Sequence, residues 1–300
     1  MGEGSQFALL TERRFLPFFL TQFFGAANDN VFKFAFTILA TYSAAEWGGL
    51  EPKSAGAVIG GIFILPFVLF SATAGQLADK YDKSAIIRFV KNLEIAIMLA
   101  IAAGFVLKIV SLLLAGVFLM GLHSTLFGPV KYAYLPQHLR DSELVGVPGV
   151  GPDLVAVVSL VLAIAGRIAA GFVPASPAPE PGLAINWNPF TETWKNLGHA
   201  RTNRSVFLSL LGISWLWFFG SIFLTTFTGY AKETLGGDQN VVTLLLAVFS
   251  IGIGVGSLLC ERLSGHTVEI GLVPFGSIGL SLFGIELYFA SVAYSSTVPV

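Results

Sequence analysis

The sequence predicts an all-α membrane protein with about eight membrane-spanning helices. Hydrophobic residues make up 54% of the chain and charged residues 12%, whereas soluble domains carry about 25% charged residues. Among the 300 residues are 33 glycines and 27 phenylalanines, which is typical of closely packed helices in lipid. The net charge of −1 gives no reason to expect a nucleic-acid partner. A single cysteine excludes an intrachain disulfide framework.

Eight apolar segments are long enough to cross a bilayer. They cover approximately residues 15–42, 55–78, 86–107, 109–130, 154–173, 206–229, 241–259 and 268–293. Only Leu107-Lys108-Ile109 separates the third from the fourth, so these two segments form a tight hairpin. The third segment begins with several polar residues, and its first turns therefore lie in the headgroup region or face protein. Two of them, Lys91 and Glu94, are three residues apart and can pair on one helix face.

The first segment contains a carboxylate, Asp29, between Asn28 and Asn30. A charged group inside a span is costly, so it usually faces a bundle interior or a water-filled cavity and marks a functional site. Gly25 and the two asparagines fit a helix that is loosened at this depth, which is tolerated where the backbone lines protein or water. The alternative is a structural aspartate that caps a kinked helix. We predict that Asp29 points into the bundle, on the side of the fourth segment.

A proline-rich stretch divides the chain after the fifth segment. Four prolines between residues 174 and 183 predict a stiff, extended linker. Asn188 then suits a helix N-cap and Pro189 the first helical position. The residues that follow predict an amphipathic helix at the membrane interface, with Trp187, Phe190, Trp194 and Leu197 on its apolar stripe. The predicted parts are an N-terminal half (1–173), the linker with its interfacial helix (174–204) and a partial C-terminal half (205–300).

A weak internal repeat relates the two halves. Gly75 precedes Asp79-Lys80 by one turn, with Lys83 shortly after, and Gly256 similarly precedes Glu261-Arg262. In each half the motif follows the second span. The glycine permits close helix approach, and the charges can cap a helix or lock one half against the other. Parallel repeats of this kind occur in one large class of transporters, and they predict that the two acid–base pairs lie on the same side of the membrane.

Basic residues indicate the orientation through the positive-inside rule. If the first four spans alternate, most basic residues fall on one, cytoplasmic face, and Lys53 and Lys108 fall on the other. The basic cluster from Lys195 to Arg204 should also be cytoplasmic. Only one apolar span, however, separates this cluster from Arg140, and one crossing would place it outside. Either that span fails to cross, or the second half inserts inverted.

These motifs resemble the lysophospholipid transporters of the major facilitator superfamily. The Gly75-to-Lys83 loop looks like the superfamily signature between its second and third helices. Asn28-Asp29-Asn30 resembles the family's Asp-Asn element, and Gly128-Pro129-Val130-Lys131-Tyr132 resembles its Pro-x-Lys-Tyr element. Where the family has a fifth helix, after Glu143-Leu-Val-Gly146, this chain runs directly toward the sixth, and Val300 follows what would be the ninth helix of twelve. We therefore expect an incomplete bundle, with a gap where the fifth helix would pack.

The resemblance implies movement of lysophospholipid between the leaflets of the bacterial inner membrane, or across it, without ATP hydrolysis. A lysophosphatidylethanolamine headgroup has a phosphate, which Lys131 can pair, and an ammonium, which Asp29 can bind. Asn28 and Asn30 add neutral donors and acceptors. For Lys131 the alternative is a side chain that reaches the interface at its helix end. His123 either carries a proton or hydrogen-bonds a neighbouring helix.

The same resemblance assigns a gating role to the acid–base motifs of the two halves. The loop would latch the cytoplasmic gate through Gly75, Asp79, Lys80 and Lys83, with Glu261 and Arg262 as the counterpart in the second half.

The sequence gives no sign of an enzyme, a cofactor or a metal site. It contains no Walker-type phosphate loop, no histidine with the spacing of an acyltransferase motif and no His/Cys cluster with metal-ligand spacing. Two alternatives to lysophospholipid transport are kept. One is a proton-coupled facilitator for another small amphiphile, and the other is the non-catalytic membrane portion of a fused phospholipid acyltransferase.

Overall fold

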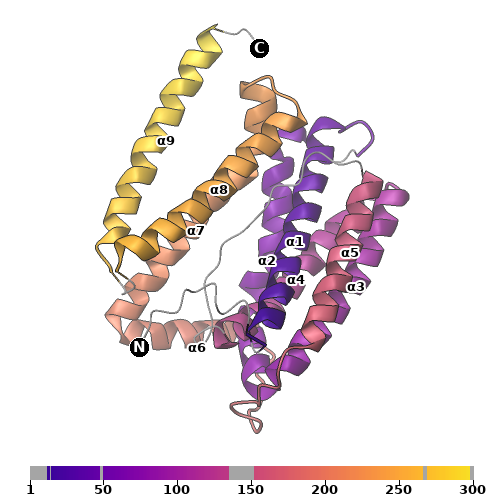
Figure 1. Ribbon diagram of the computed structural model, residues 1–300, viewed down its shortest axis with the longest axis vertical. Coiled ribbons are helices and arrows are strands. Elements are labelled where there is room, and N and C mark those ends of the chain that lie inside the picture. Colours follow the sequence, from indigo (N-terminus) through magenta and orange to yellow (C-terminus); the bar gives the residue numbers. More distant parts are fainter. Residues whose placement is uncertain (1–11, 14, 48–49, 135–151, 266–268, 298–300) are drawn as a thin grey trace. The chain divides into compact units, whose positions relative to one another are not determined.

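The computed structural model describes residues 12–13, 15–47, 50–134, 152–265 and 269–297, and every regular element in this part of the chain is helical (Figure 1). The predicted apolar segments form eight long helices, and a shorter helix follows the linker. Their bounds are α1 Leu16–Tyr42, α2 Pro52–Lys80, α3 Lys83–Val106, α4 Val110–Tyr134, α5 Pro152–Gly171, α6 Pro189–Thr202, α7 Arg204–Gly229, α8 Gln239–Leu263 and α9 Leu272–Thr297. A short π-helix, η3, covers Tyr230–Thr234. The predicted all-α fold class is confirmed.

Seven of the described helices are long and apolar enough to cross a membrane, and α1 is not among them. The difference from the eight predicted spans has a simple cause. Helix α1 carries a cluster of polar side chains in its middle, at Asn28, Asp29, Asn30 and Lys33, and these lower its hydropathy. It is nevertheless a continuous helix of 27 residues, which is long enough for a bilayer.

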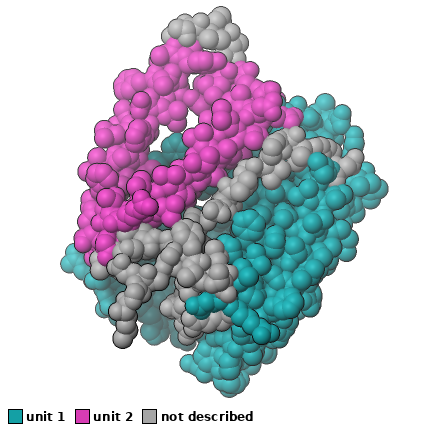
Figure 2. All heavy atoms as spheres, viewed as in Figure 1, with its two compact units in different colours: residues 1–140, 150–225 teal, residues 141–149, 226–300 magenta. Residues whose placement is uncertain are grey.

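The chain forms two compact units (Figure 2). The first contains residues 1–140 and 150–225, and the second contains residues 141–149 and 226–300. The linker, α6 and most of α7 thus group with the first unit. The sequence predicted three parts from changes in composition. Compactness does not test that division, so it stays a prediction.

Helices α1 to α5 of the first unit form a closed ring. Helix α1 packs against α2 and α5, α2 packs against α4, and α3 packs against both α4 and α5. Because α5 touches α1 on one side and α3 on the other, no helix-sized opening separates these five helices. The gap that we expected from the sequence is therefore not found in this ring. The segment in which the missing helix was sought, residues 143–151, lies outside the described residues.

One end of the ring is marked by an apolar cluster from all five helices. It joins the start of α1 (Phe18) and of α3 (Ile87, Val90) to the ends of the other three helices. The members from those ends are Ala78 of α2, Phe127 and Val130 of α4, Ala170 of α5 and Val173, which follows α5. Helices α4 and α5 thus end on the same side and run parallel to each other.

This parallel arrangement corrects the topological argument made from the sequence. We expected either that residues 154–173 fail to cross or that the second half inserts inverted. Instead, α5 crosses the ring and ends beside the α2–α3 loop, where Lys83 N donates to Ser176 O (3.0 Å) and Glu180 N donates to Asp79 O (2.9 Å). The linker therefore begins on the side where the basic α2–α3 loop lies, as the positive-inside rule requires.

Helix α6 begins where the sequence predicts. The Asn188 side chain caps it by accepting hydrogen bonds from the backbone N–H groups of Phe190 and Thr191, and Pro189 occupies the first position. The aromatic side chains of Trp187, Phe190 and Trp194 are exposed, whereas α6 packs against α2. An exposed aromatic stripe beside a membrane-length helix is the pattern of a helix at the membrane interface.

The second unit contains the end of α7, η3, α8 and α9. Asp238 caps α8 by accepting from the backbone N–H groups of Asn240 and Val241. The Tyr230 hydroxyl of η3 lies 2.7 Å from Ser291 Oγ of α9. The Tyr294 hydroxyl donates to Leu235 O at 3.0 Å. These tyrosines fasten the π-helical segment to α9.

Candidate functional site

A buried ion pair lies inside the helical ring of the first unit. Lys91 Nζ and Glu94 Oε2 of α3 are 2.6 Å apart, and their side chains are 1% and 0% exposed. The pairing predicted from the three-residue spacing is confirmed. The sequence predicted that the start of the third span lies in the headgroup region or faces protein, and the structure places Lys91 and Glu94 in the protein interior, whereas Asn92 is exposed. A charge pair in this position is costly to bury, and it is retained only when its other hydrogen-bonding groups are satisfied.

Glu94 connects three helices. Asn28 Nδ2 of α1 donates to Glu94 Oε1 at 2.7 Å. His123 Nε2 of α4 lies 3.3 Å from Glu94 Oε2, in a geometry that makes no hydrogen bond. Asn28 and His123 are both buried. The carboxylate therefore pairs with a lysine of its own helix and accepts from an amide of α1, and an imidazole of α4 lies close to it.

Two glycines provide the space for the Lys91 ammonium. A Cβ atom added at Gly25 of α1 would lie 2.6 Å from Lys91 Nζ, and one added at Gly166 of α5 would lie 3.2 Å from it. On its remaining side the ammonium lies 5.8 Å from the centre of the Phe127 ring, within the range of a cation–π interaction. The lysine head thus occupies a site that is shaped by α1, α4 and α5.

Asp29 faces helix α4, as we predicted. Its Oδ2 accepts a hydrogen bond from Ser124 Oγ at 2.5 Å, and Ser124 follows His123 in α4. The predicted orientation of this carboxylate is confirmed. One turn later, Lys33 Nζ lies 4.7 Å from the centre of the Phe63 ring of α2, so the polar face of α1 extends over about two turns.

The structure describes the contacts of Asn30, but not those of the Lys131 side chain. Asn30 turns to its own helix, where Nδ2 donates to Ala26 O at 2.7 Å. Such a bond to the preceding turn satisfies the Asn30 amide within its own helix, and it competes with the backbone hydrogen bonds of that helix. Lys131 lies in the last turn of α4, and its side chain is outside the described part of the structure. The site roles of these residues stay predictions.

Several buried polar side-chain atoms in the ring have no hydrogen-bond partner among the described residues. In helices α1 and α4 they are Gln22 Nε2, Asn28 Oδ1, Asp29 Oδ1 and both ring nitrogens of His123. Buried polar groups are nearly always hydrogen-bonded, and each exception calls for an explanation. These five atoms lie on the two helices that bring Asn28 and His123 to Glu94, and a sixth such atom, Ser159 Oγ, lies on α5.

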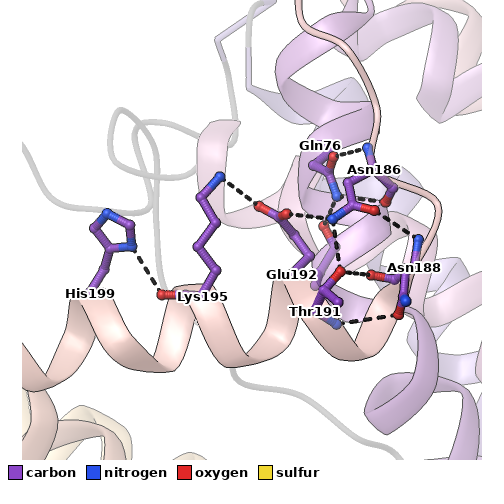
Figure 3. A network of polar contacts seen from close by, with 8 residues as sticks. Gln76, Asn186, Asn188, Thr191, Glu192, Lys195 and His199 are labelled. Carbon is purple, nitrogen blue, oxygen red and sulfur yellow. Dashed lines mark hydrogen bonds and ion pairs between the residues drawn. The ribbon is translucent and has the colours of Figure 1, made fainter.

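The end of α2 and the start of α3, where the gating residues of the first half were predicted, are tied to the linker. Gly75, Asp79 and Lys80 lie in the last turns of α2, and Lys83 is the buried first residue of α3. Gln76 exchanges two hydrogen bonds with the Asn186 backbone, donating to its carbonyl at 3.2 Å and accepting from its N–H at 2.7 Å (Figure 3). The loop is thus held by a strap formed by residues 174–188.

The strap is also anchored to α6. In Figure 3 the Asn186 side chain points to the first turn of α6, where its amide nitrogen donates to Thr191 Oγ1 at 2.9 Å and to Glu192 Oε2 at 3.1 Å. Lys195 Nζ donates to Glu192 Oε1 at 3.4 Å. Through these contacts the end of α2 is connected to the interfacial helix.

In the second unit, Glu261 and Arg262 lie in the last turn of α8, as Asp79 and Lys80 do in α2. The Arg262 side chain is exposed, and that of Glu261 is outside the described part. The prediction that both acid–base pairs face the same side of the membrane concerns two separate units, and it stays a prediction.

An apolar groove of about 480 Å³ lies at one end of the seam between α1 and α5. Leu16, Pro17 and Leu20 line it from α1. Ala169 and Gly171 of α5, together with Phe172, form the opposite wall, and Arg13 lies at its edge. A groove with hydrocarbon walls and a cation at one end is suited to a lipid chain with an anionic headgroup.

Sequence reasoning placed three of the clustered residues at the site: Asn28, Asp29 and His123. It noted that Lys91 and Glu94 pair but assigned them no role, and it did not single out Ser124. The signal was present, because two opposite charges at helical spacing inside an apolar span are themselves unusual. No group of three or more His, Cys, Asp or Glu side chains suited to a metal ion occurs in the described part of the chain.

Comparison with known proteins shows similarity to bacterial lysophospholipid transporters. The chain is 24% identical over 300 residues to the lysophospholipid transporter LplT of Enterobacter sp. (strain 638), covering 91% of this chain and 71% of that protein. The LplT of Escherichia fergusonii is 25% identical, with 92% and 71% covered. The LplT of Escherichia coli O1:K1 / APEC is 26% identical, with 81% and 64% covered.

No protein-family model matches the chain, and no solved structure matches it either. The similarity to LplT proteins and the seven helices of membrane-spanning character together identify a multi-pass protein of the bacterial inner membrane.

Proposed function

We propose that this protein moves lysophospholipid between the leaflets of the bacterial inner membrane, or across it, without ATP hydrolysis. The similarity to lysophospholipid transporters over about nine-tenths of the chain supports the substrate class. The structural observation that carries the proposal is the set of buried polar side chains inside the ring of α1 to α5. Ionisable side chains inside a membrane bundle are costly, and they usually mark the path of a substrate or an ion.

The headgroup of lysophosphatidylethanolamine requires an anion and a cation from the protein. In our proposal Asp29 binds the ammonium, since it faces the ring and has one carboxylate oxygen with no partner among the described residues. Lys131, at the end of α4, binds the phosphate. Asn28 and Asn30 provide further polar contacts from the adjoining positions of α1.

The single acyl chain requires an apolar surface that opens to lipid. The groove between α1 and α5 has hydrocarbon walls and adjoins the helices that bear the polar cluster. A chain lying there would leave the headgroup free to enter the ring. Arg13, at the edge of the groove, would attract phosphate at the membrane surface.

Access to the site would be controlled from the α2–α3 loop. Gly75, Asp79, Lys80 and Lys83 form the latch in this proposal, with Glu261 and Arg262 of the second unit as its counterpart. The hydrogen bonds between the loop and the strap give this latch a defined position in the first unit.

The function is tested with the purified 300-residue chain in liposomes that contain no ATP. Labelled lysophosphatidylethanolamine is loaded into one leaflet, and the fraction extracted by albumin from the outer leaflet is followed over time. We expect faster exchange than in protein-free liposomes, and a decrease of about tenfold for Asp29→Asn, since a charged hydrogen bond is lost.

Asp238→Asn is the matched control, because asparagine caps a helix as well as aspartate does and this residue caps α8 in the other unit. It should exchange lipid like the unmodified protein. Exchange no faster than in protein-free liposomes would refute the proposal, and an unchanged rate for Asp29→Asn would remove Asp29 from the site.

A proton-coupled facilitator for another small amphiphile is the second candidate. The approach of His123 to Glu94, 3.3 Å within the ring, favours it, because imidazole and carboxylate groups are the usual carriers of protons in membrane transporters. Uptake that follows an imposed pH gradient, with no preference for lysophospholipid, would support this second function over the first.

A further inference from the structure

We propose that helix α6, together with the first residue of α7, binds anionic phospholipids at the membrane surface, and that this binding steadies the strap beside the α2–α3 loop. An interfacial position for α6 does not by itself favour one lipid over another, so the evidence for an anionic partner comes from the charges that the helix exposes. The lipid is a resident of the membrane rather than the transported molecule, and this site is therefore independent of the proposed function.

The exposed charges of this segment are all positive. Lys195, Arg201 and Arg204 are exposed, whereas Glu192, the single carboxylate between residues 189 and 204, is buried. Glu192 is also compensated within α6, because Lys195 Nζ donates to its Oε1 at 3.4 Å. Among the described residues no carboxylate pairs with either arginine. The surface is therefore complementary to the phosphate groups of anionic lipids.

The aromatic side chains of α6 share a face with one of these arginines. Trp194 and Arg201 are two helical turns apart, so their side chains project in nearly the same direction. Phe190 lies one turn before Trp194, and the two rings are 64% and 67% exposed. Aromatic rings are favoured at the boundary between headgroups and acyl chains. A helix that lies there brings its basic side chains to the depth of the lipid phosphates.

The junction of α6 and α7 is where we place the headgroup. The Arg201 guanidinium lies 5.6 Å from the centre of the Phe207 ring of α7, within the range of a cation–π interaction. A ring over one face of a guanidinium leaves its N–H donors available at the edge, and these match the oxygens of a phosphate. Arg204, the first residue of α7, adds a second cation three residues further along the chain.

The first turn of α6 connects this surface to the strap. The Asn186 side chain donates to Thr191 and Glu192 (Figure 3). Its backbone exchanges two hydrogen bonds with Gln76 at the end of α2. Lipid bound to α6 would fix one end of this network. The backbone hydrogen bonds of the strap should therefore open less often when anionic lipid is present.

The test follows the tryptophan fluorescence of the full chain in vesicles made of equal parts of diacyl phosphatidylglycerol and diacyl phosphatidylcholine. Bromine on the acyl chains near the headgroup quenches an indole on contact, and either one lipid or the other carries it, so the vesicles differ only in the label. A Trp215→Phe/Trp217→Phe background leaves Trp187 and Trp194 as the exposed indoles, since Trp47 is 2% exposed.

We expect stronger quenching when phosphatidylglycerol carries the bromine. A basic residue at an anionic surface contributes about fivefold in binding, so Arg201→Gln/Arg204→Gln should remove most of this difference. Arg201→Lys/Arg204→Lys keeps both charges and should retain most of it. Lys108→Gln is the matched control, because it removes an exposed cation from the α3–α4 hairpin, and it should leave the difference unchanged.

Hydrogen exchange tests the consequence for the strap. The Asn186 N–H, which donates to Gln76 Oε1 at 2.7 Å, should exchange several-fold more slowly in the mixed vesicles than in vesicles of phosphatidylcholine alone. The slowing should be lost in Arg201→Gln/Arg204→Gln. Exchange at Asn186 that does not respond to phosphatidylglycerol would overturn the role assigned to the strap.

Equal quenching by the two labelled lipids, or an undiminished difference in Arg201→Gln/Arg204→Gln, would overturn the lipid site. Weak quenching by both lipids, with protection of α6 that rises with the number of protein copies per vesicle, would also overturn it, because a second copy of the chain would then cover this face. Neither measurement uses lysophospholipid or transport, so a failure of the proposed function would leave their outcome unaffected.

Discussion

At the scale of single residues, the position of a side chain in the ring decides which groups it contacts. Lys91 and Glu94 are ordinary helical neighbours in sequence, but burial inside the ring turns them into a strongly interacting pair. Asn30 adjoins Asp29 in sequence, yet its amide is satisfied by its own helix. Neighbours in the sequence therefore meet different surroundings, because successive residues of a helix point in directions about 100° apart.

Asp82 is the residue that joins the latch loop to the strap. Its Oδ1 accepts from Ser84 Oγ at 2.5 Å and from Ala85 N at 2.9 Å, and its Oδ2 accepts from Ser176 N at 3.0 Å. Partial burial acts to raise the pKa of the Asp82 carboxyl, but these hydrogen bonds outweigh it and hold the pKa below its ordinary value of 3.8. The ionised form is therefore favoured in the folded protein.

We predict that Asp82→Ala destabilises the folded protein by about 1 kcal/mol through loss of the α3 cap, and that it speeds hydrogen exchange in residues 174–180. Since the folded pKa lies below the unfolded one, the stabilisation is complete above pH 3.8. It is lost as the pH falls through the lowered folded value. Denaturation in detergent at a series of pH values measures this.

The unmodified protein and the variant should differ at neutral pH and converge in acid. A stability difference that is independent of pH would show that the Asp82 charge has no part in holding the strap.

At the scale of helices, close packing between α2 and α4 depends on a glycine. A Cβ atom at Gly121 would lie 2.1 Å from the Phe63 carbonyl oxygen and 3.1 Å from Pro66 Cγ. The obstacle is backbone, which cannot rotate away as a side chain can. Small residues at such points are what allow membrane helices to approach each other.

We predict that Gly121→Ala lowers the free energy of unfolding by about 1–3 kcal/mol, since an extra methyl group in a packed interior forces the helices apart. Gly128→Ala is the control on the same helix, where no atom lies within 4 Å of the added Cβ. This control should be neutral or slightly stabilising, because alanine favours the helix. Thermal unfolding in detergent compares the two, and equal effects would mean that α2 and α4 are not in contact at Gly121.

At the scale of the whole molecule, the repeat predicts how the two units share the membrane. Asp79-Lys80 ends α2 and Glu261-Arg262 ends α8, so each pair lies at the C-terminal end of its helix. If the units are parallel repeats, both ends face the cytoplasm. The exposed Cys260 adjoins Glu261 and provides a natural reporter of its side.

We predict that a membrane-impermeant maleimide labels Cys260 in inverted membrane vesicles but not in intact spheroplasts. In a Cys260→Ser background, Tyr81→Cys beside Lys80 should behave in the same way, and Lys108→Cys in the α3–α4 hairpin should show the opposite pattern. Tyr81 and Lys108 are both exposed in the structure, so their labelling reports the membrane side. Labelling of Cys260 and Tyr81→Cys from opposite sides would disprove the parallel repeat.

The sequence alone determined the class of protein and most of its helices. Apolar segments of membrane length give helices wherever they occur, because the bilayer leaves the backbone no other partner. Local signals also predicted the start of α6 at Asn188-Pro189. The orientation of Asp29 toward the ring was predictable as well, because a carboxylate exposed to lipid is costly.

Only the tertiary structure decided which helices are neighbours and which polar groups meet. The burial of Lys91 and Glu94 depends on Asn28, His123, Gly25 and Gly166 from three other helices, and no periodicity within one segment contains that information. The parallel course of α4 and α5 was likewise hidden, because counting apolar spans assumes that successive helices alternate in direction. The closed ring depends on packing between helices that are distant in sequence, which is why it could be recognised only in three dimensions.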